Sequence, residues 1–369
     1  MTSFKNLPVR AVWLICLLFI CLPILAQERR PDQKPEQKKE DDAATIRVDT
    51  DLVTLDVAVA DREANRSTAG LRVEDFVVYE NGVRQKVSSF EATEVPFNLV
   101  LLIDTSGSTR GDVELMRRAV RGFLKELRPQ DRVALIQFNK EVELLKDLTA
   151  NRQAIDAALD LLNAGSGTSY YDALQLTLEE VLGKVEGRKA IVALTDGVDS
   201  FGHRTYEQVL PRLEKGRVSS YFLELDTESF TQAGMVRNCA EQVHFEFSSK
   251  QLRKYVKEYG GKATESYFES HCELSKMERI QINQRLYESA RRELREVADK
   301  TGGRVYPVKE LQQLDKAYSQ IAAEIRTQYS LAYYPTNEKH DGKWRSVKVE
   351  IKQPGFAAHT RAGYRAPNN

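Results

Sequence analysis

Continuous apolar runs alternate with amphipathic helical patterns along the middle of the chain. The apolar runs predict the strands Asn98–Asp104, Arg132–Phe138, Ala190–Thr195, Val218–Leu225 and Arg304–Tyr306, with an edge strand at Glu141–Leu145. Apolar residues three or four apart predict the helices Val113–Leu127, Arg152–Leu162, Tyr171–Val185, Tyr206–Lys215 and Leu311–Arg326. We expect Pro211 to bend or end the fourth helix. The alternation predicts an α/β fold, a doubly wound and mostly parallel sheet with helices on both faces.

Both flanks of this region have the period of β-strands. Alternating apolar residues begin at Ile46, and Asn81-Gly82 separates two short β-prone runs, which is typical of a hairpin. The C-terminal flank predicts the strands Tyr329–Tyr334, Trp344–Ile351 and Thr360–Tyr364. Neither flank has enough strands for a stable sheet pair by itself. We therefore expect residues 45–95 and 327–369 to form one small β-sandwich, into which the α/β region 96–326 is inserted.

Residues 226–280 exceed what the alternating scheme needs, and we interpret them as an insertion near the ligand-binding edge of the sheet. Leu286, Ala290, Leu294 and Ala298 recur at helical spacing, so Arg279–Lys300 is predicted to form one long amphipathic helix. This helix could pack on the sheet or bind a partner, and the pattern leaves both open.

The N-terminal 44 residues are expected to lie outside the folded part. Lys5 and Arg10 precede an apolar run that ends at Ala26, which predicts a secretory signal peptide over residues 1–26. An uncleaved membrane anchor and a lipoprotein cleaved before Cys21 are the alternatives. Residues 27–44 are charged or polar and predict a disordered linker. The protein is therefore predicted to be exported.

Composition allows a full core and gives no electrostatic reason for a highly charged partner. The chain has 369 residues, 41% of them hydrophobic, and a net charge of zero. Nothing therefore favours nucleic acid or an anionic membrane. After cleavage the cysteines are Cys239 and Cys272. In an exported chain they either form a disulfide or remain two buried thiols.

Oxygen-bearing side chains follow two predicted strands and one glycine-rich loop. Asp104, Ser106 and Ser108 come directly after the first central strand, Thr168 precedes a predicted helix, and Asp196 follows another strand. In an open α/β sheet the carboxyl ends of the strands form the ligand-binding edge. A set of ligands that offers only oxygen atoms, with no Cys or His among them, suits a hard cation such as Mg²⁺. The alternative for each motif alone is a helix cap or a turn.

The three motifs together resemble the von Willebrand factor type A family. Its metal-ion-dependent adhesion site reads Asp-x-Ser-x-Ser, then Thr, then Asp. The resemblance implies a Rossmann-like domain in which Asp104, Ser106, Ser108, Thr168 and Asp196 surround Mg²⁺, or else Mn²⁺ or Ca²⁺. Further short sequence motifs resemble those of an exported bacterial group of type A proteins that is frequent in Acidobacteria. They include Tyr79-Glu80-Asn81-Gly82-Val83, Thr301-Gly302-Gly303-Arg304, Tyr333-Tyr334-Pro335 and Arg361-Ala362-Gly363-Tyr364.

What the family does implies a function for this chain. Ser106 and Ser108 would bind the metal directly, Asp104 and Asp196 would carry the charge, and Thr168 would be the ligand that shifts between closed and open forms. An Asp or Glu of a protein partner would fill the vacant metal position. The resemblance thus implies an exported adhesion or protein-binding module, periplasmic or at the cell surface. It would not bind nucleic acid, and would contact a membrane only through an uncleaved signal segment.

Two other classes of function remain as alternatives. One is a structural scaffold that needs no metal. The other is an Mg²⁺-dependent phosphohydrolase with Asp104 as its nucleophile. Haloacid-dehalogenase-type enzymes place Asp-x-Asp at such a strand end, whereas this chain has Asp104-Thr105-Ser106 and lacks the second carboxylate. The chain also has no His-Glu-x-x-His, no Gly-x-Ser-x-Gly and no Cys-x-x-Cys. We therefore predict that the protein is not an enzyme.

Overall fold

The structure is a computed structural model that describes residues 52–61, 70–92, 96–237, 245–261, 267 and 271–368. The side chains of Asp61 and of residues 110–112 are not described. The predicted signal peptide, the predicted linker and Cys239 lie outside the described residues. Within them, no helix has the length and apolar character needed to span a membrane.

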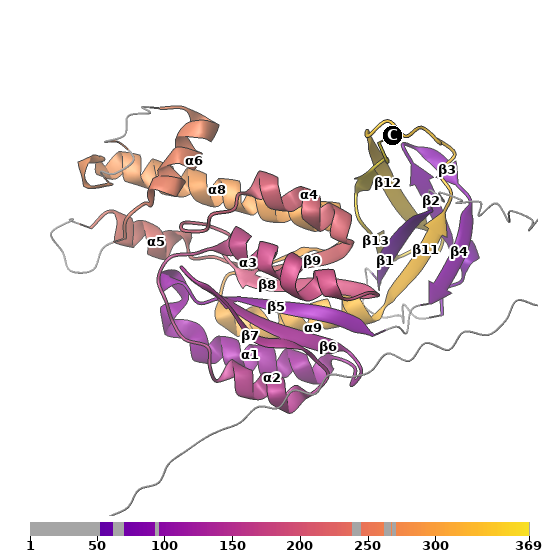
Figure 1. Cartoon of the computed structure of the whole chain (residues 1–369), viewed down its shortest axis with the longest axis horizontal. Helices are drawn as coiled ribbons and strands as arrows, with labels where there is room; N and C mark the ends of the chain where they lie inside the picture. Colours follow the sequence, from indigo (N-terminus) through magenta and orange to yellow (C-terminus); the bar gives the residue numbers. More distant parts are fainter. Residues whose placement is uncertain are drawn as a thin grey trace, which may run out of the picture. The chain divides into compact units, whose positions relative to one another are not determined.

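A mostly parallel sheet of six strands forms the centre of the α/β region (Figure 1). Its strands are β5 (Phe97–Asp104), β6 (Arg132–Phe138), β7 (Val142–Thr149), β8 (Arg188–Thr195), β9 (Val218–Leu225) and β10 (Val305–Val308). Their order is β10-β9-β8-β5-β6-β7, and only β7 runs antiparallel to its neighbour. The strand order reverses at β5, because β6 lies on one side of it and β8 on the other.

Helices cover both faces of this sheet (Figure 1). One face carries α1 (Val113–Glu126), α2 (Arg152–Leu159) and α9 (Leu314–Arg326); the other carries α3 (Tyr170–Leu176), α4 (Tyr206–Gly216) and α8 (Lys276–Thr301). Successive residues of β5 enter opposite cores, since Leu101 packs with the first set and Leu102 with the second. Both cores are apolar, which explains the continuous hydrophobic runs of the central strands.

The flanking segments form two antiparallel four-stranded sheets. One has the order β13 (Phe356–His359), β1 (Val53–Asp61), β11 (Gln328–Tyr333), β4 (Val87–Ala92). The other has the order β14 (Gly363–Arg365), β12 (Trp344–Ile351), β2 (Phe76–Glu80), β3 (Val83–Gln85). Residues of both sheets share one hydrophobic core, which makes them a sandwich. The predicted fold class, an α/β domain inserted in a β-sandwich built from both ends, is confirmed.

The long crossover from β9 to β10 carries helices of its own. They are α5 (Glu228–Met235), α6 (Ser249–Tyr259) and α8, which is longer at both ends than the predicted Arg279–Lys300. Met235, Leu252 and Leu286 belong to a small hydrophobic cluster that joins the three helices. Cys272 is disulfide-bonded, and its partner lies outside the described residues. The predicted pairing of Cys239 with Cys272 therefore stays a prediction.

Two local predictions need correction. Pro211 does not end its helix, because α4 continues from Tyr206 to Gly216. A proline in the second turn removes one backbone donor, and the apolar contacts of Val209, Leu210 and Leu213 hold the helix in place. The predicted helix Tyr171–Val185 is α-helical only to Leu176 and continues in π and 3-10 turns.

Candidate metal centre

The carboxyl ends of β5 and β8 bring two of the predicted motifs together. The two strands are parallel neighbours with Ile103 opposite Leu194, so Asp104 and Asp196 emerge at the same edge of the sheet. This edge lies where the strand order reverses, which is where ligands bind in open α/β sheets.

Asp104 is fully buried and held by a neighbouring loop and strand. Its Oδ1 accepts a hydrogen bond from the Ser106 amide at 3.0 Å, and its Oδ2 accepts one from the Thr195 hydroxyl at 2.7 Å. Thr195 Oγ1 in turn accepts the amide of Gly197 at 3.0 Å, which places the loop after β8 against the loop after β5.

The serine hydroxyls connect the two carboxylates. Ser106 Oγ and Ser108 Oγ are 3.2 Å apart, and Ser108 Oγ donates to Asp196 Oδ2 at 3.3 Å. Asp196 Oδ1 accepts the Val198 amide at 2.9 Å. The structure thus brings Asp104, Ser106, Ser108 and Asp196 into one hydrogen-bonded group.

Backbone hydrogen bonds hold the fifth predicted residue, Thr168, against the loop that follows β8. Its amide donates to Ser200 Oγ at 2.8 Å, and its carbonyl accepts the amides of Ser200 at 2.8 Å and Phe201 at 2.9 Å. The same loop reaches the other side of the site, where the Gly165 amide donates to the Thr105 carbonyl at 2.7 Å. All three predicted loops therefore meet at this edge.

Burial controls the electrostatics of the two carboxyl groups. Desolvation, followed by the charge of Asp196, raises the pKa of Asp104 to about 7. Desolvation also raises the pKa of Asp196, against the lowering effect of its hydrogen bonds to Thr227 and Val198. No lysine or arginine within the described ranges forms an ion pair with either group. The donors that face them are hydroxyls and backbone amides.

This donor set fits a hard divalent cation. Two carboxylates and at least two hydroxyls lie together, with no cationic side chain of the described residues paired to them, and oxygen ligands of this kind suit Mg²⁺, Mn²⁺ or Ca²⁺. In the part of the chain that the structure describes, no three His, Cys, Asp or Glu side chains come together so as to hold a metal ion. A cation at this edge would therefore depend on hydroxyl oxygens as well as carboxylates.

Asp199 lies in the same loop as Asp196 but has a cationic partner. Its Oδ1 accepts a hydrogen bond from Lys250 Nζ of α6 at 2.7 Å. The structure thus buries Asp199 in an ion pair. Sequence reasoning could not find this pair, because Lys250 is far away in the chain.

Three hydroxyls at the site were not predicted from the sequence. Thr195 bonds Asp104, as described above, while Thr227 Oγ1 and Tyr287 OH donate to Asp196 Oδ2 at 2.6 and 3.4 Å. Thr195 belongs to the motif Thr195-Asp196 and was overlooked within it. Thr227 and Tyr287 come from the crossover after β9, and no sequence motif marks them.

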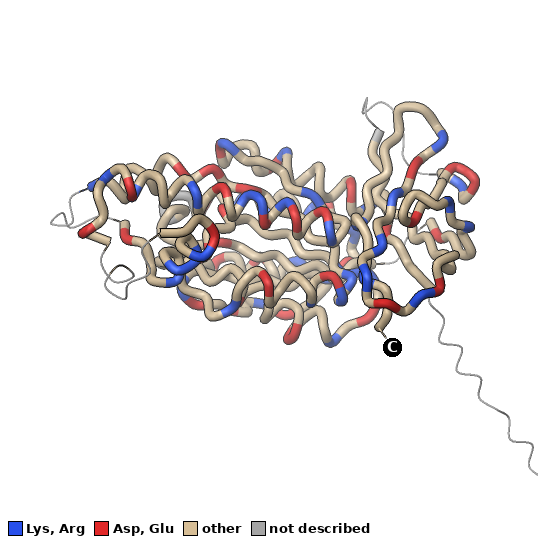
Figure 2. The backbone as a smooth tube through the Cα atoms, turned by 90° about the horizontal axis from the view of Figure 1, so that it is seen from above, with Lys and Arg blue, Asp and Glu red and all other residues tan. Residues whose placement is uncertain are grey.

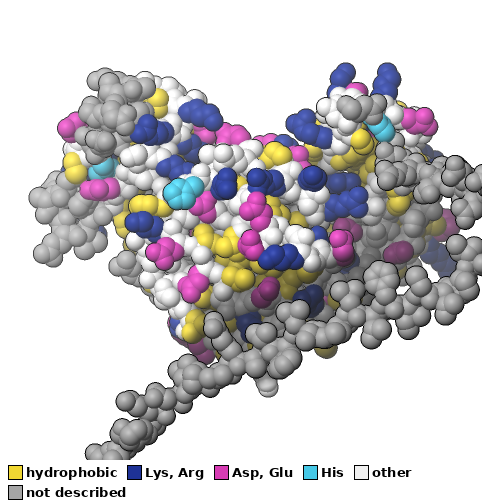
Figure 3. Space-filling model, in the orientation of Figure 1, with side chains coloured by type: hydrophobic (Ala, Val, Ile, Leu, Met, Phe, Trp, Pro, Cys, Tyr) yellow, Lys and Arg dark blue, Asp and Glu magenta, His cyan; other side chains and the backbone are white. Residues whose placement is uncertain are grey.

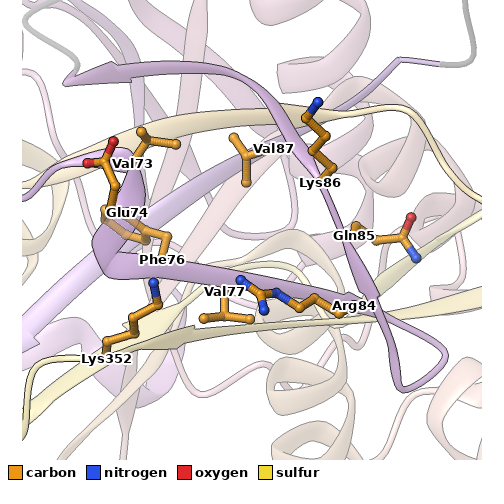
Figure 4. A pocket seen from close by; sticks show the side chains of 9 residues that line it. All are labelled: Val73, Glu74, Phe76, Val77, Arg84, Gln85, Lys86, Val87 and Lys352. Atoms are coloured by element: carbon orange, nitrogen blue, oxygen red, sulfur yellow. The ribbon is translucent and has the colours of Figure 1, made fainter.

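A groove of about 500 Å³ lies away from these loops, at the edge of the sandwich. Its lining includes apolar Val73, Val77 and Val87, with charged side chains around them (Figure 4). Arg84 and Lys86 lie on and beside β3, an edge strand, where charge discourages pairing with another chain. We assign this groove no chemistry.

Charge elsewhere on the molecule is mixed. Figure 2 shows cationic and acidic residues interspersed along the backbone, and Figure 3 shows apolar side chains scattered among charged ones on the face in view. This distribution agrees with the net charge of zero, and the described residues on the face in view form no strongly charged patch.

Comparison with known proteins gives a family for part of the chain. Residues 99–198 match the model of the von Willebrand factor type A domain. The uncharacterized protein YfbK of Escherichia coli K12 is 30% identical over 149 residues, 38% of this chain and 26% of that protein. Inter-alpha-trypsin inhibitor heavy chain H4 of Sus scrofa is 25% identical over 185 residues, 47% of this chain and 19% of that protein. The chain thus spans well under half the length of these relatives.

The solved structures that resemble this chain share little sequence with it. The conserved hypothetical protein BatB from Bacteroides thetaiotaomicron has 15% identity and a TM-score of 0.40, over 63% of this chain and 98% of that one. Proximal thread matrix protein 1 from the mussel byssus, with a zinc-occupied MIDAS motif, has 13% identity and a TM-score of 0.40, over 67% of this chain and 49% of that one.

Proposed function

The chain carries a von Willebrand factor type A domain, and on this premise we propose that it is a protein-binding module that depends on a divalent cation. Asp104, Ser106, Ser108, Thr168 and Asp196 would hold the cation, which we propose to be Mg²⁺, with Mn²⁺ or Ca²⁺ as substitutes. The proposed partner is a protein that presents an Asp or Glu side chain to the metal.

One observation carries this proposal. Asp104 and Asp196 are buried beside each other, and the described residues give neither of them a cationic partner. Buried carboxylates are normally paired with a positive charge or bound to a metal. The neighbouring Asp199 is paired with Lys250, so the same loop shows how this chain neutralises a carboxylate when no metal is involved.

A bound divalent ion would supply a positive charge that a partner's carboxylate can reach at the edge of the sheet. Backbone amides and one hydroxyl of this chain hold the two carboxylates in place. The Ser106 amide and the Thr195 hydroxyl orient the carboxylate of Asp104, and the Val198 amide orients that of Asp196. The donors are neutral, so they fix the carboxylates without cancelling the charge that attracts a cation.

Adhesion is favoured over catalysis by what surrounds Asp104. A phosphoryl-transfer enzyme needs a general acid or base next to its nucleophile. Among the described residues, the hydrogen bonds to the Asp104 carboxylate come from Ser106 and the Thr195 hydroxyl, and we assign the neighbouring Asp196 to the cation. We therefore propose a binding role without catalysis, and a phosphatase assay on wild-type protein and Asp104→Asn tests that part of the proposal.

Export is a separate part of the proposal. It is supported by the charged and apolar pattern of residues 5–26. Expression of the full chain in a bacterium with an export system, followed by mass spectrometry of the mature protein, tests it. We expect an N-terminus at Gln27 and a periplasmic or surface location; retention of the intact N-terminus in the cytoplasm would contradict export.

Metal binding is tested by titrating the metal-free full chain with Mn²⁺ and Mg²⁺ in a calorimeter. We expect the wild type to bind one ion and Asp104→Asn to bind none. Asp199→Asn is the matched control, because it alters a buried carboxylate of the same site loop that already has a lysine partner. A wild type that gives no heat and no rise in melting temperature with either ion would favour the metal-free scaffold instead.

Partner binding is tested with the same variants. Proteins captured by the wild type should be lost with EDTA and with Asp104→Asn, but retained with Asp199→Asn. Capture that persists in EDTA would show that the contact does not depend on a cation.

A further inference from the structure

Two hydroxyls from the crossover between β9 and β10 reach the carboxylate of Asp196. Thr227 Oγ1 donates to Asp196 Oδ2 at 2.6 Å, and Tyr287 OH approaches the same oxygen at 3.4 Å. Neither residue lies within residues 99–198, which match the type A domain model. We propose that Thr227 and Tyr287 are positioning residues that set the affinity of the site for its cation. This inference rests on the proposed function.

The two hydroxyls belong to a network that joins two helices. Tyr287 OH lies 2.8 Å from Thr227 Oγ1 and 2.8 Å from Thr231 Oγ1. Thr227 is the residue before α5, Thr231 lies one turn further along α5, and Tyr287 lies near the middle of α8. The Tyr287 ring is buried, with 3% of its surface exposed. The network therefore ties Asp196 to both helices.

The network fixes the rotation of the Asp196 carboxylate. The Val198 amide holds Oδ1 at 2.9 Å, and the Thr227 hydroxyl holds Oδ2 at 2.6 Å. With both oxygens anchored, the carboxylate plane cannot turn freely about the bond between Cβ and Cγ. Groups that orient a metal-binding side chain in this way commonly change metal affinity by about 10- to 100-fold when they are removed.

Neutral donors suit this task better than a cation would. A lysine or arginine would also fix the carboxylate, but its charge would reduce the attraction of the site for a metal ion. Asp199, held by Lys250 Nζ at 2.7 Å, shows that arrangement three residues away. Asp196 receives hydroxyls instead, so its position is fixed while its charge stays available.

The contact also links metal binding to the crossover. If the carboxylate position that binds the metal is the one held by Thr227 and Tyr287, then the metal must in turn stabilise the contact of α5 and α8 with the site, because such coupling is reciprocal. The packing supports this link, since Leu294 of α8 lies directly against Gly197, where an added Cβ would come within 2.9 Å of it.

The test uses the full chain, Mn²⁺ as the probe and single hydroxyl deletions. Thr227→Val and Tyr287→Phe remove the donors while keeping the shape of each side chain, and Thr227→Ser restores a hydroxyl. Tyr318→Phe is the matched control, because Tyr318 is also buried and its hydroxyl has no hydrogen-bond partner among the described residues. Calorimetry gives the Mn²⁺ dissociation constant, and amide hydrogen exchange reports the protection of α5.

We expect Thr227→Val and Tyr287→Phe to weaken Mn²⁺ binding by about 10-fold or more. Thr227→Ser should stay within about threefold of the wild type, and Tyr318→Phe should match it. Mn²⁺ should slow amide exchange in α5 of the wild type and have little effect in Tyr287→Phe. A purely structural role for the hydroxyls would lower the melting temperature of the metal-free protein without this selective loss.

Several results would overturn the inference. Wild-type affinity in both Thr227→Val and Tyr287→Phe would show that the hydroxyls do not position Asp196. Equal losses in Thr227→Ser and Thr227→Val, or an equal loss in Tyr318→Phe, would point to packing instead. Mn²⁺ binding by the wild type with unchanged variants refutes this inference alone, whereas no binding by the wild type refutes the proposed function as well.

Discussion

Replacing Asp104 by asparagine should make the metal-free protein more stable at alkaline pH. Burial, together with the nearby charge of Asp196, raises the pKa of Asp104 from 3.8 to about 7. Because the folded state holds this proton more tightly than the unfolded state, stability falls as the pH rises from about 4 to about 7. At pH 8 the ionised carboxylate therefore disfavours the folded state, and asparagine removes that effect.

The size of the effect follows from the two pKa values. A difference between 3.8 and about 7 corresponds to about 4 kcal/mol of unfolding free energy. Asparagine keeps the acceptor for the Ser106 amide but gives up the hydrogen bond from Thr195 at 2.7 Å, which costs about 1 kcal/mol. The net expectation is a gain of about 3 kcal/mol for Asp104→Asn at pH 8, and of less than about 1 kcal/mol at pH 5, where only the first part of the penalty has developed.

Urea unfolding in EDTA at pH 5 and pH 8 measures this difference. Asp75→Asn is a useful control, because a hydrogen bond from the Arg72 amide lowers the pKa of that carboxyl group. Its difference from the wild type should be the same at pH 5 and pH 8, since Asp75 is ionised at both. If Asp104→Asn were equally destabilised at the two pH values, the argument that the site lacks a compensating charge would be refuted.

Three further perturbations test other parts of the account. Mn²⁺ at a hundred times its dissociation constant should add about 2.7 kcal/mol to the unfolding free energy of the wild type, and nothing to that of Asp104→Asn. Urea unfolding with and without EDTA measures this difference. Equal gains in both proteins would place the metal elsewhere. Lys254→Met should lower the unfolding free energy by about 3 kcal/mol, because Lys254 Nζ lies 2.7 Å from the buried Glu293. Adding Glu293→Gln should recover part of this loss in the same assay. An unchanged unfolding free energy in Lys254→Met would show that the pair contributes little. Gly82→Ala should lower the unfolding free energy by about 1 kcal/mol, since Gly82 has a φ of +79° in the turn between β2 and β3. Unchanged stability in thermal and urea unfolding would contradict this prediction.

The central sheet could be predicted because its residues are apolar without interruption. β6 and β9 have the predicted bounds, since strands buried on both faces leave a continuous signal in the sequence. The hairpin at Asn81-Gly82 was predicted for a local reason as well, because both residues have the positive φ that such turns require.

Other elements depend on contacts that no local pattern records. β13 has only four residues, and its pairing with β1 was not predicted. Pro211 does not end α4, because the packing of the helix outweighs the missing backbone donor.

The candidate site shows the same limit. Its five predicted residues lie at strand ends and in one glycine-rich loop, where motif spacing is informative. Thr227 and Tyr287 contact Asp196, and Lys250 contacts Asp199, from segments that are distant in the sequence, so only the structure reveals these contacts.

The most direct test of the metal site is diffraction from crystals soaked in Mn²⁺, measured where manganese scatters anomalously. The account predicts a single strong peak enclosed by the side-chain oxygens of Asp104, Ser106, Ser108 and Asp196. A map with no peak there, or with manganese bound only at other carboxylates, would contradict the central claim.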